Sequence, residues 1–205
     1  MRLFITMQIR DIKDKIRYAC LWLCRFGDSR GFGVQSPTAY SFIRYVINEH
    51  YPYYAYSDLK IKYPDLTWME YKLLELYFRI SNFKQATQWV CDTKGKYGDG
   101  VILADYIKSA CSANDVVDSL YVNNKPDVIL LSCLSEILND IDRIFNYTHS
   151  STVIIIEDIH SSDKAKGIWK KMIADERTGR TYDLYYCGIV FMDKEKFKQH
   201  YVVNF

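Results

Sequence analysis

Short apolar segments alternate with helical patterns from residue 86 onward, and this alternation limits the fold more than any other feature of the sequence. Runs at 86–91, 127–133 and 152–156 are short, and the last two are almost entirely apolar, as in strands buried on both faces. Helices are expected at 103–111, 134–145 and 165–173. Strands that alternate with helices form a parallel sheet covered on both faces, so the sequence predicts an α/β fold.

The end and the middle of this sheet are expected to depart from a regular parallel arrangement. The last two strands are expected at 182–192 and 200–205, and residues 193–199 leave no room for a crossover helix between them. These two strands should therefore pair as an antiparallel β-hairpin. In the middle, residues 112–126 stand where a complete half-sheet would need about 30 residues. The sequence thus predicts a shortened sheet, with 116–118 as one residual strand.

Helical patterns dominate the N-terminal part of the chain. Apolar residues recur at helical spacing at Ile9, Ile12, Ile16, Ala19 and Leu23. Ser36, which precedes a proline, is expected to cap a second helix, and Thr67 with Glu70 forms the capping box of a later one. We therefore expect a helical region at 1–82 that packs on an α/β core at 83–205, both within one integrated domain.

Composition and charge exclude several classes of protein. The sequence is 49% hydrophobic and 25% charged, as in globular proteins, and its net charge of +2 is too small to indicate nucleic-acid binding. No apolar run is long enough to span a membrane, and the N-terminus lacks the pattern of a signal peptide. The six cysteines, Cys20 and Cys24 included, are expected to be reduced core residues. We therefore expect a cytoplasmic protein.

The segments 31–37 (GFGVQSP), 153–161 (VIIIEDIHS), 187–191 (CGIVF) and 199–205 (QHYVVNF) resemble parts of a bacterial family of S-adenosylmethionine (SAM) dependent methyltransferases. The resemblance implies the class I methyltransferase fold, a Rossmann-like α/β sheet that ends in an antiparallel β-hairpin. It also implies SAM as the cofactor and a small molecule as the methyl acceptor.

The resemblance implies that the loop after the first strand binds SAM. Glycines are needed there because the backbone must pass close to the methionine and the ribose. The family carries an acidic residue followed by spaced glycines, and this chain offers Asp92, Gly95, Gly98 and Gly100. Asp118 stands 20 positions after Gly98, near the usual spacing of a ribose-binding acid.

The middle of the sequence also departs from the family pattern. Lys94, Lys96 and Tyr97 are bulky where a cofactor would need close approach, so a plain surface loop explains this segment equally well. The strand at 127–133 ends in Leu-Ser-Cys, where metal-dependent O-methyltransferases carry an acid. Because a hard divalent cation needs several oxygen ligands, no metal ion is expected.

Three candidate catalytic residues, Glu157, Asp158 and His160, follow the third apolar strand. Ligands of open α/β sheets bind beyond the carboxyl ends of the strands, and a carboxylate beside an imidazole can remove a proton from a hydroxyl. Alternatively, Asp158 or Ser161 caps the following helix. The two roles are compatible.

The helical region is expected to close the ligand site. The candidate substrate-binding residues are Gln35, Ser36, Tyr54 and Tyr56. Tyrosine rings exclude water and can still form hydrogen bonds, so the segment 51–56 is a natural lid, although packing of the helices on the sheet explains it as well. We expect one pocket bounded by the loop 92–100, Asp158 and part of 31–56.

Two functions of different classes follow from these features. The first is a SAM-dependent methyltransferase that acts on an unknown small molecule. The alternative is a catalytically inactive methyltransferase-like protein that serves in binding or assembly, because the middle of the sequence has lost family features. A shortened sheet can expose an edge or an apolar face, so a homodimer is possible.

Overall fold

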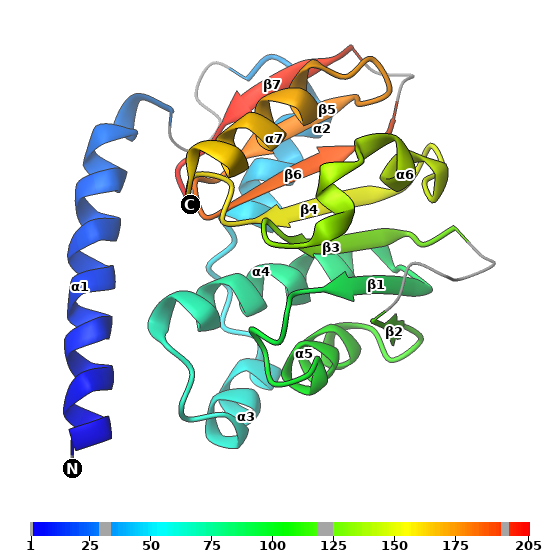
Figure 1. Ribbon diagram of the computed structural model, residues 1–205. Helices are drawn as coiled ribbons and strands as arrows, with labels where there is room; N and C mark the ends of the chain where they lie inside the picture. The colour runs from blue at the N-terminus through cyan, green and yellow to red at the C-terminus, as the bar shows by residue number, and fades with distance from the viewer. Residues whose placement is uncertain (1, 29–33, 119–124, 194–196) are drawn as a thin grey trace.

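The protein is described by a computed structural model that covers residues 2–28, 34–118, 125–193 and 197–205, with side chains from residue 11 onward. Its centre is a seven-stranded sheet of order β2-β1-β3-β4-β6-β5-β7 (Figure 1). The strands are β1 Gln88–Asp92, β2 Asp115–Val117, β3 Val128–Ser132, β4 Val153–Glu157, β5 Arg180–Asp183, β6 Cys187–Phe191 and β7 Gln199–Val202. The helices are α1 Arg2–Cys24, η1 Phe26–Asp28, α2 Pro37–Phe42, η2 Ile43–Ile47, α3 Tyr54–Lys62, α4 Trp68–Lys84, α5 Val101–Ala110, η3 Glu136–Asn139, α6 Ile141–Asn146 and α7 Asp163–Ala174.

One half of the sheet is parallel. Strands β2, β1, β3 and β4 pair in parallel, and the helix α5 connects β1 to β2. Every residue of β3 and β4 is buried, as their apolar sequences predict. The expected α/β fold is confirmed, and the residual strand expected at 116–118 is the short edge strand β2.

The other half contains the antiparallel pair, at a different place from the one expected. The predicted single strand 182–192 is two strands, β5 and β6, which form the hairpin, and β6 lies between β4 and β5. The turn between them is closed by the backbone of Leu184 and Cys187 and contains Tyr185 at a φ of 71°. The last strand, β7, pairs in parallel with β5, so the predicted antiparallel pairing of 182–192 with 200–205 was wrong.

Helices cover both faces of the sheet. Alternate residues of each strand point to opposite faces, so Leu130 packs with α2, η2, α4 and α5 while Leu131 packs with α6 and α7. The capping box of Thr67 and Glu70 is present at the start of α4, and Ser36 caps α2. The helix expected at 134–145 is interrupted, because Asp140 ends η3 and caps α6.

Helix α1 stands at one side of the sheet (Figure 1), and residues from its middle contact the start of α4. Asp11 on α1 accepts a hydrogen bond from the backbone nitrogen of Trp68 at 3.1 Å. Cys20 and Cys24 are exposed on this helix and Cys111 and Cys133 are only partly buried, so the expectation that all six cysteines lie in the core holds for Cys91 and Cys187 alone. Within the described ranges, no helix has the length and apolar character needed to cross a membrane.

Candidate functional site

A polar cavity of about 400 Å³ lies beyond the carboxyl ends of β4 and β5. Its floor is formed by Lys96, Asp158, His160, Ser161, Tyr185 and Tyr186, which follow β1, β4 and β5. Its walls are formed by Asp14 and Arg17 of α1 and by Thr67, Met69, Glu70 and Leu73 at the start of α4. We call this space the site cavity. Both its place beyond the strand ends and its volume fit a small-molecule site.

A buried carboxylate organises the floor of the site cavity. Glu157, the last residue of β4, is fully buried and accepts hydrogen bonds from the hydroxyls of Tyr77 and Tyr97, the latter at 2.5 Å. The Lys96 ammonium lies 2.9 Å from Glu157 and 3.3 Å from Asp158, so it pairs with both carboxylates. Burial and the neighbouring Glu157 raise the pKa of both tyrosines well above the usual value, which keeps them as neutral donors.

The charge of Lys96 is held by the same carboxylates. Burial alone would lower the pKa of this ammonium, but the nearby charges of Glu157 and Asp158 outweigh it and raise the pKa. Lys96 therefore stays protonated at neutral pH. It forms a fixed cation between the glycine-containing loop and the end of β4.

A histidine and a second acid form a pair on the floor. His160 places its Nε2 atom 2.7 Å from Asp183, the last residue of β5, and its ring stacks on Tyr185 at 4.9 Å. Asp183 also accepts hydrogen bonds from Arg25 at 2.7 Å and from Trp169 at 3.2 Å. Burial would raise the pKa of Asp183, but the charge of Arg25 and the hydrogen bonds from Arg25 and His160 lower it. Asp183 is therefore ionised, and it orients the imidazole of His160.

The loop expected to bind the cofactor lies at the same edge of the sheet. Gly95, Gly98 and Gly100 all have positive φ angles, and among the described residues nothing lies within 4 Å of the position of a Cβ atom on Gly95 or Gly100. Asp118 directly follows β2 and is exposed. Asp92 accepts a hydrogen bond from Ser135 at 2.5 Å. The five predicted residues thus share one edge, with open space beside two glycines.

Two bulky residues of this loop point inward. The side chain of Tyr97 is fully buried, and the Lys96 side chain turns from the loop toward β4. Lys94 instead stays at the surface, with its ammonium 3.4 Å from Asp92. The loop therefore reaches Glu157 with two of its side chains and leaves its glycine backbone open on the other side.

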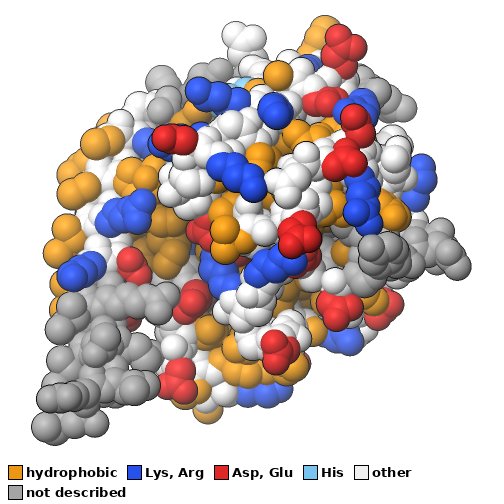
Figure 2. Space-filling model, viewed as in Figure 1, with side chains coloured by type: hydrophobic (Ala, Val, Ile, Leu, Met, Phe, Trp, Pro, Cys, Tyr) orange, Lys and Arg blue, Asp and Glu red, His pale blue; other side chains and the backbone are white. Residues whose placement is uncertain are grey.

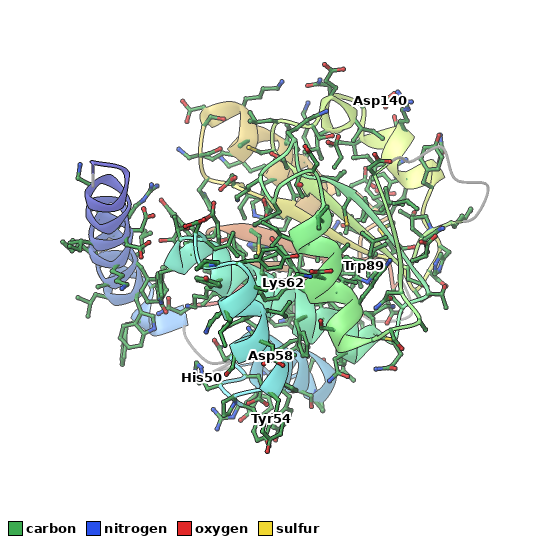
Figure 3. The ribbon with its side chains drawn as sticks, turned by 90° about the horizontal axis from the view of Figure 1, so that it is seen from below. His50, Tyr54, Asp58, Lys62, Trp89 and Asp140 are labelled. Atoms are coloured by element: carbon green, nitrogen blue, oxygen red, sulfur yellow. The ribbon has the colours of Figure 1, made fainter. Side chains whose placement is uncertain are left out.

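The predicted substrate-binding residues lie elsewhere. Gln35 and Ser36 line a different cavity together with Arg180, which starts β5 and so stands at the opposite edge of the sheet from Asp183. Tyr54 is 91% exposed and points away from the molecule (Figure 3), and Tyr56 lies on the buried side of α3. Of the expected pocket, Lys96 of the loop 92–100 and Asp158 do line the site cavity, but the boundary expected at 31–56 was wrong, since α1 and the start of α4 close the cavity instead.

The capping alternative for the residues after β4 is also settled by geometry. Ser162 caps α7, because its hydroxyl accepts a hydrogen bond from the backbone of Ala165 at 3.1 Å. Asp158 and Ser161 are thus not the cap, and both line the site cavity. Asp158 has a φ of 57°, which turns the chain sharply at the end of β4. In the part of the chain that the structure describes, no group of three or more potential metal ligands occurs.

Asp183 and Arg25 are site residues that the sequence reasoning missed. Asp183 could have been recognised as an acid at the carboxyl end of a strand. It was overlooked because a single strand was predicted at 182–192, which placed Asp183 near the start of that strand instead of at the end of β5. Arg25 comes from the far end of α1, and only the packing of this helix brings it to the sheet.

Comparisons with known proteins give matches among solved structures alone. No protein-family model and no curated protein matches the sequence. Among solved structures, the SAH-bound Podospora anserina methyltransferase PaMTH1 matches at 6% identity over 79% of this chain and 94% of that chain, with a TM-score of 0.48. The O-methyltransferase from Bacillus cereus in complex with SAH matches at 13% identity over 72% and 96% of the two chains, with a TM-score of 0.40.

These similarities say nothing about the substrate of this chain. The fold is defined by its own sheet, in which a parallel half is followed by an antiparallel strand inserted before the last parallel ones. That arrangement agrees with the sequence resemblance in having a parallel half and an antiparallel hairpin, and it differs in the strand β7 beyond the hairpin.

Proposed function

We propose that the chain is a SAM-dependent methyltransferase that transfers a methyl group to a hydroxyl of a small molecule bound in the site cavity. The observation that carries the proposal is the pair of His160 and Asp183 on the floor of a cavity next to an open glycine loop. SAM, when bound, supplies the methyl group to be transferred. Gly95 and Gly100 would pass close to it, and Asp118 would accept hydrogen bonds from its ribose.

The floor of the cavity offers both a base and a donor for the acceptor molecule. With Nε2 of His160 directed at Asp183, Nδ1 is left to take a proton from the acceptor hydroxyl. The Tyr186 hydroxyl is buried and has no hydrogen-bond partner among the described residues. Burial raises the pKa of Tyr186 to about 12, so it stays protonated and can donate to a polar acceptor.

Calorimetric titration with SAM tests the proposal directly. Saturable heat at micromolar to millimolar SAM is expected, reduced in an Asp118→Asn variant and unchanged in Asp115→Asn, three residues earlier on the same edge strand. No heat at millimolar SAM would overturn the methyltransferase proposal. It would favour the second candidate function, a non-catalytic binding or assembly protein. One observation supports this candidate, namely that the Lys96 ammonium already pairs with the carboxylates of Glu157 and Asp158.

Replacing His160 by alanine is expected to lower the rate of methyl transfer by roughly 100-fold or more, because a positioned base contributes about 10² to 10⁴ in rate. The measurement is transfer of radiolabelled methyl from SAM to a panel of small phenols and alcohols, while SAM affinity stays unchanged. His149→Ala is the matched control, because His149 pairs with Asp127 before the amino end of β4. Equal rates in both variants would remove His160 from the reaction.

A further inference from the structure

Helix α1 turns an apolar stripe to solvent, while its opposite side contacts the protein through polar groups and through the ring of Tyr18. Ile12, Ile16 and Leu23 are 57%, 60% and 68% exposed, and Ala19 between them is exposed too. Figure 2 shows hydrophobic side chains along the outer edge of the molecule on the side where α1 lies, with Lys and Arg beside them. An amphipathic helix usually buries its aliphatic stripe, whereas α1 leaves this stripe exposed.

The polar side of α1 is tied to the body of the protein. Asp11 binds the backbone of Trp68, Arg25 pairs with Asp183, and the Trp22 carbonyl accepts a hydrogen bond from Asn204 at 2.9 Å. A rotation of α1 that buried the apolar stripe would break all three contacts. The stripe is therefore held facing outward.

The spacing of the stripe is that of a two-helix seam. Ile12, Ile16, Ala19 and Leu23 follow one another at intervals of four, three and four residues, and the sequence continues the same alternation at Ile5 and Ile9. Such an alternation keeps a narrow line of side chains facing one partner helix. Lys13 and Lys15 are exposed on the two sides of this line, which keeps it narrow.

We propose that this stripe, which we call the α1 seam, binds the α1 seam of a second copy of the chain in a parallel pair. The charges select the direction. In the heptad that the seam defines, Lys13 and Lys15 take the two flanking positions, and in a parallel pair they face Gln8 and Cys20 of the other copy. In an antiparallel pair centred on the seam, the four lysines of the two copies would gather at its centre and repel one another.

The pairing would also bear on the site cavity. Asp14 and Arg17 of α1 line that cavity, and Arg25 pairs with Asp183. A helix held by a second copy would keep these side chains in place. The α1 seam alone supports the dimer proposal. The proposal therefore does not depend on whether the chain transfers methyl groups.

Sedimentation equilibrium of the full chain tests the pairing. A dimer is expected, and Ile16→Glu should raise its dissociation constant by roughly 100-fold or more, because it buries a charge in the seam. Ile61→Glu is the matched control, since Ile61 is 79% exposed on α3 and lies outside the seam. Circular dichroism must show that both variants remain folded. A monomeric native chain, or equal dimerisation of both variants, would overturn the proposal.

An intermolecular crosslink tests whether the two α1 helices run parallel. Binding to lipid vesicles tests whether the α1 seam contacts a membrane surface instead of a second copy. In a chain with Cys20→Ser and Cys24→Ser, the change Ala19→Cys should form an intermolecular disulfide on oxidation, because parallel seams bring equivalent positions together. Absence of this crosslink would overturn the parallel arrangement. A monomer that floats with phosphatidylserine vesicles, and loses this binding in Ile16→Glu, would assign the seam to a membrane surface and overturn the second-copy proposal.

Discussion

Replacing Gly188 by valine is expected to lower the free energy of unfolding by about 3 kcal/mol, the upper end of what overpacking of a core costs. Gly188 lies on β6 with the indole of Trp169 directly above it. A Cβ atom at this position would lie 2.5 Å from Cζ3 and 2.6 Å from Cη2 of Trp169. Trp169 is buried and donates its indole N–H to Asp183, so it has little room to move away.

Urea denaturation of Gly188→Val and of Gly167→Ala measures this effect. Gly167 is the matched control, because it lies on α7 and no described atom lies within 4 Å of its Cβ position. Alanine there should stabilise the protein by about 0.5 to 1 kcal/mol through its higher helix propensity. A Gly188→Val variant as stable as the native chain would show that the indole is not packed on β6.

The strands of the parallel half could be predicted because their apolar runs are short and distinct. Each of the three predicted runs overlaps one strand, β1, β3 or β4, and the predicted ends lie within two residues of the observed ends. The hairpin could not be placed, because residues 182–192 are apolar through the turn and the sequence Leu184-Tyr185-Tyr186 contains no glycine, proline or asparagine. The turn is instead supported by Asp183, whose carboxylate accepts a hydrogen bond from the backbone of Tyr185 at 2.9 Å.

The candidate site could be predicted only where the residues stand directly after strands. Asp158 and His160 line the site cavity because the end of β4 fixes their position. Gln35 and Ser36 stand in the helical region, and nothing in a helical pattern tells which edge of the sheet the helix will approach. Tyr56 illustrates the same limit, since its ring packs against Phe78 at 5.1 Å and fills the core.

The side chain of Lys96 points into the protein, whereas a lysine in a surface loop is expected to point to solvent. Lysine is usually exposed, and a loop with several turn residues gives no reason to bury it. The reason lies in Glu157, which the strand β4 carries into the interior and which needs a charged partner there. That requirement depends on a contact between residues 61 positions apart, so the local sequence could not reveal it.

Replacing Lys96 by methionine is therefore expected to destabilise the protein by about 3 kcal/mol at neutral pH, because it leaves the buried carboxylate of Glu157 without its cation. The value lies at the low end for a broken buried pair, since the hydroxyls of Tyr77 and Tyr97 still donate to Glu157. Lys94→Met in the same loop is the control. Lys94 is 44% exposed and 3.4 Å from Asp92, so its loss should cost less than about 1 kcal/mol.

A double-mutant cycle separates the pair from the other contacts of Lys96. Adding Glu157→Gln to Lys96→Met removes the unpaired charge, and the double variant should recover about 2 kcal/mol relative to Lys96→Met. The pKa of Lys96 is raised in the folded protein, so its stabilising effect is complete below the usual lysine pKa of 10.5 and declines as the pH rises through the raised pKa. The difference between native and Lys96→Met chains, measured by urea denaturation, should hence stay constant from pH 7 to pH 9. No recovery in the double variant would show that Lys96 stabilises the loop through packing and that Glu157 is satisfied by the two tyrosines.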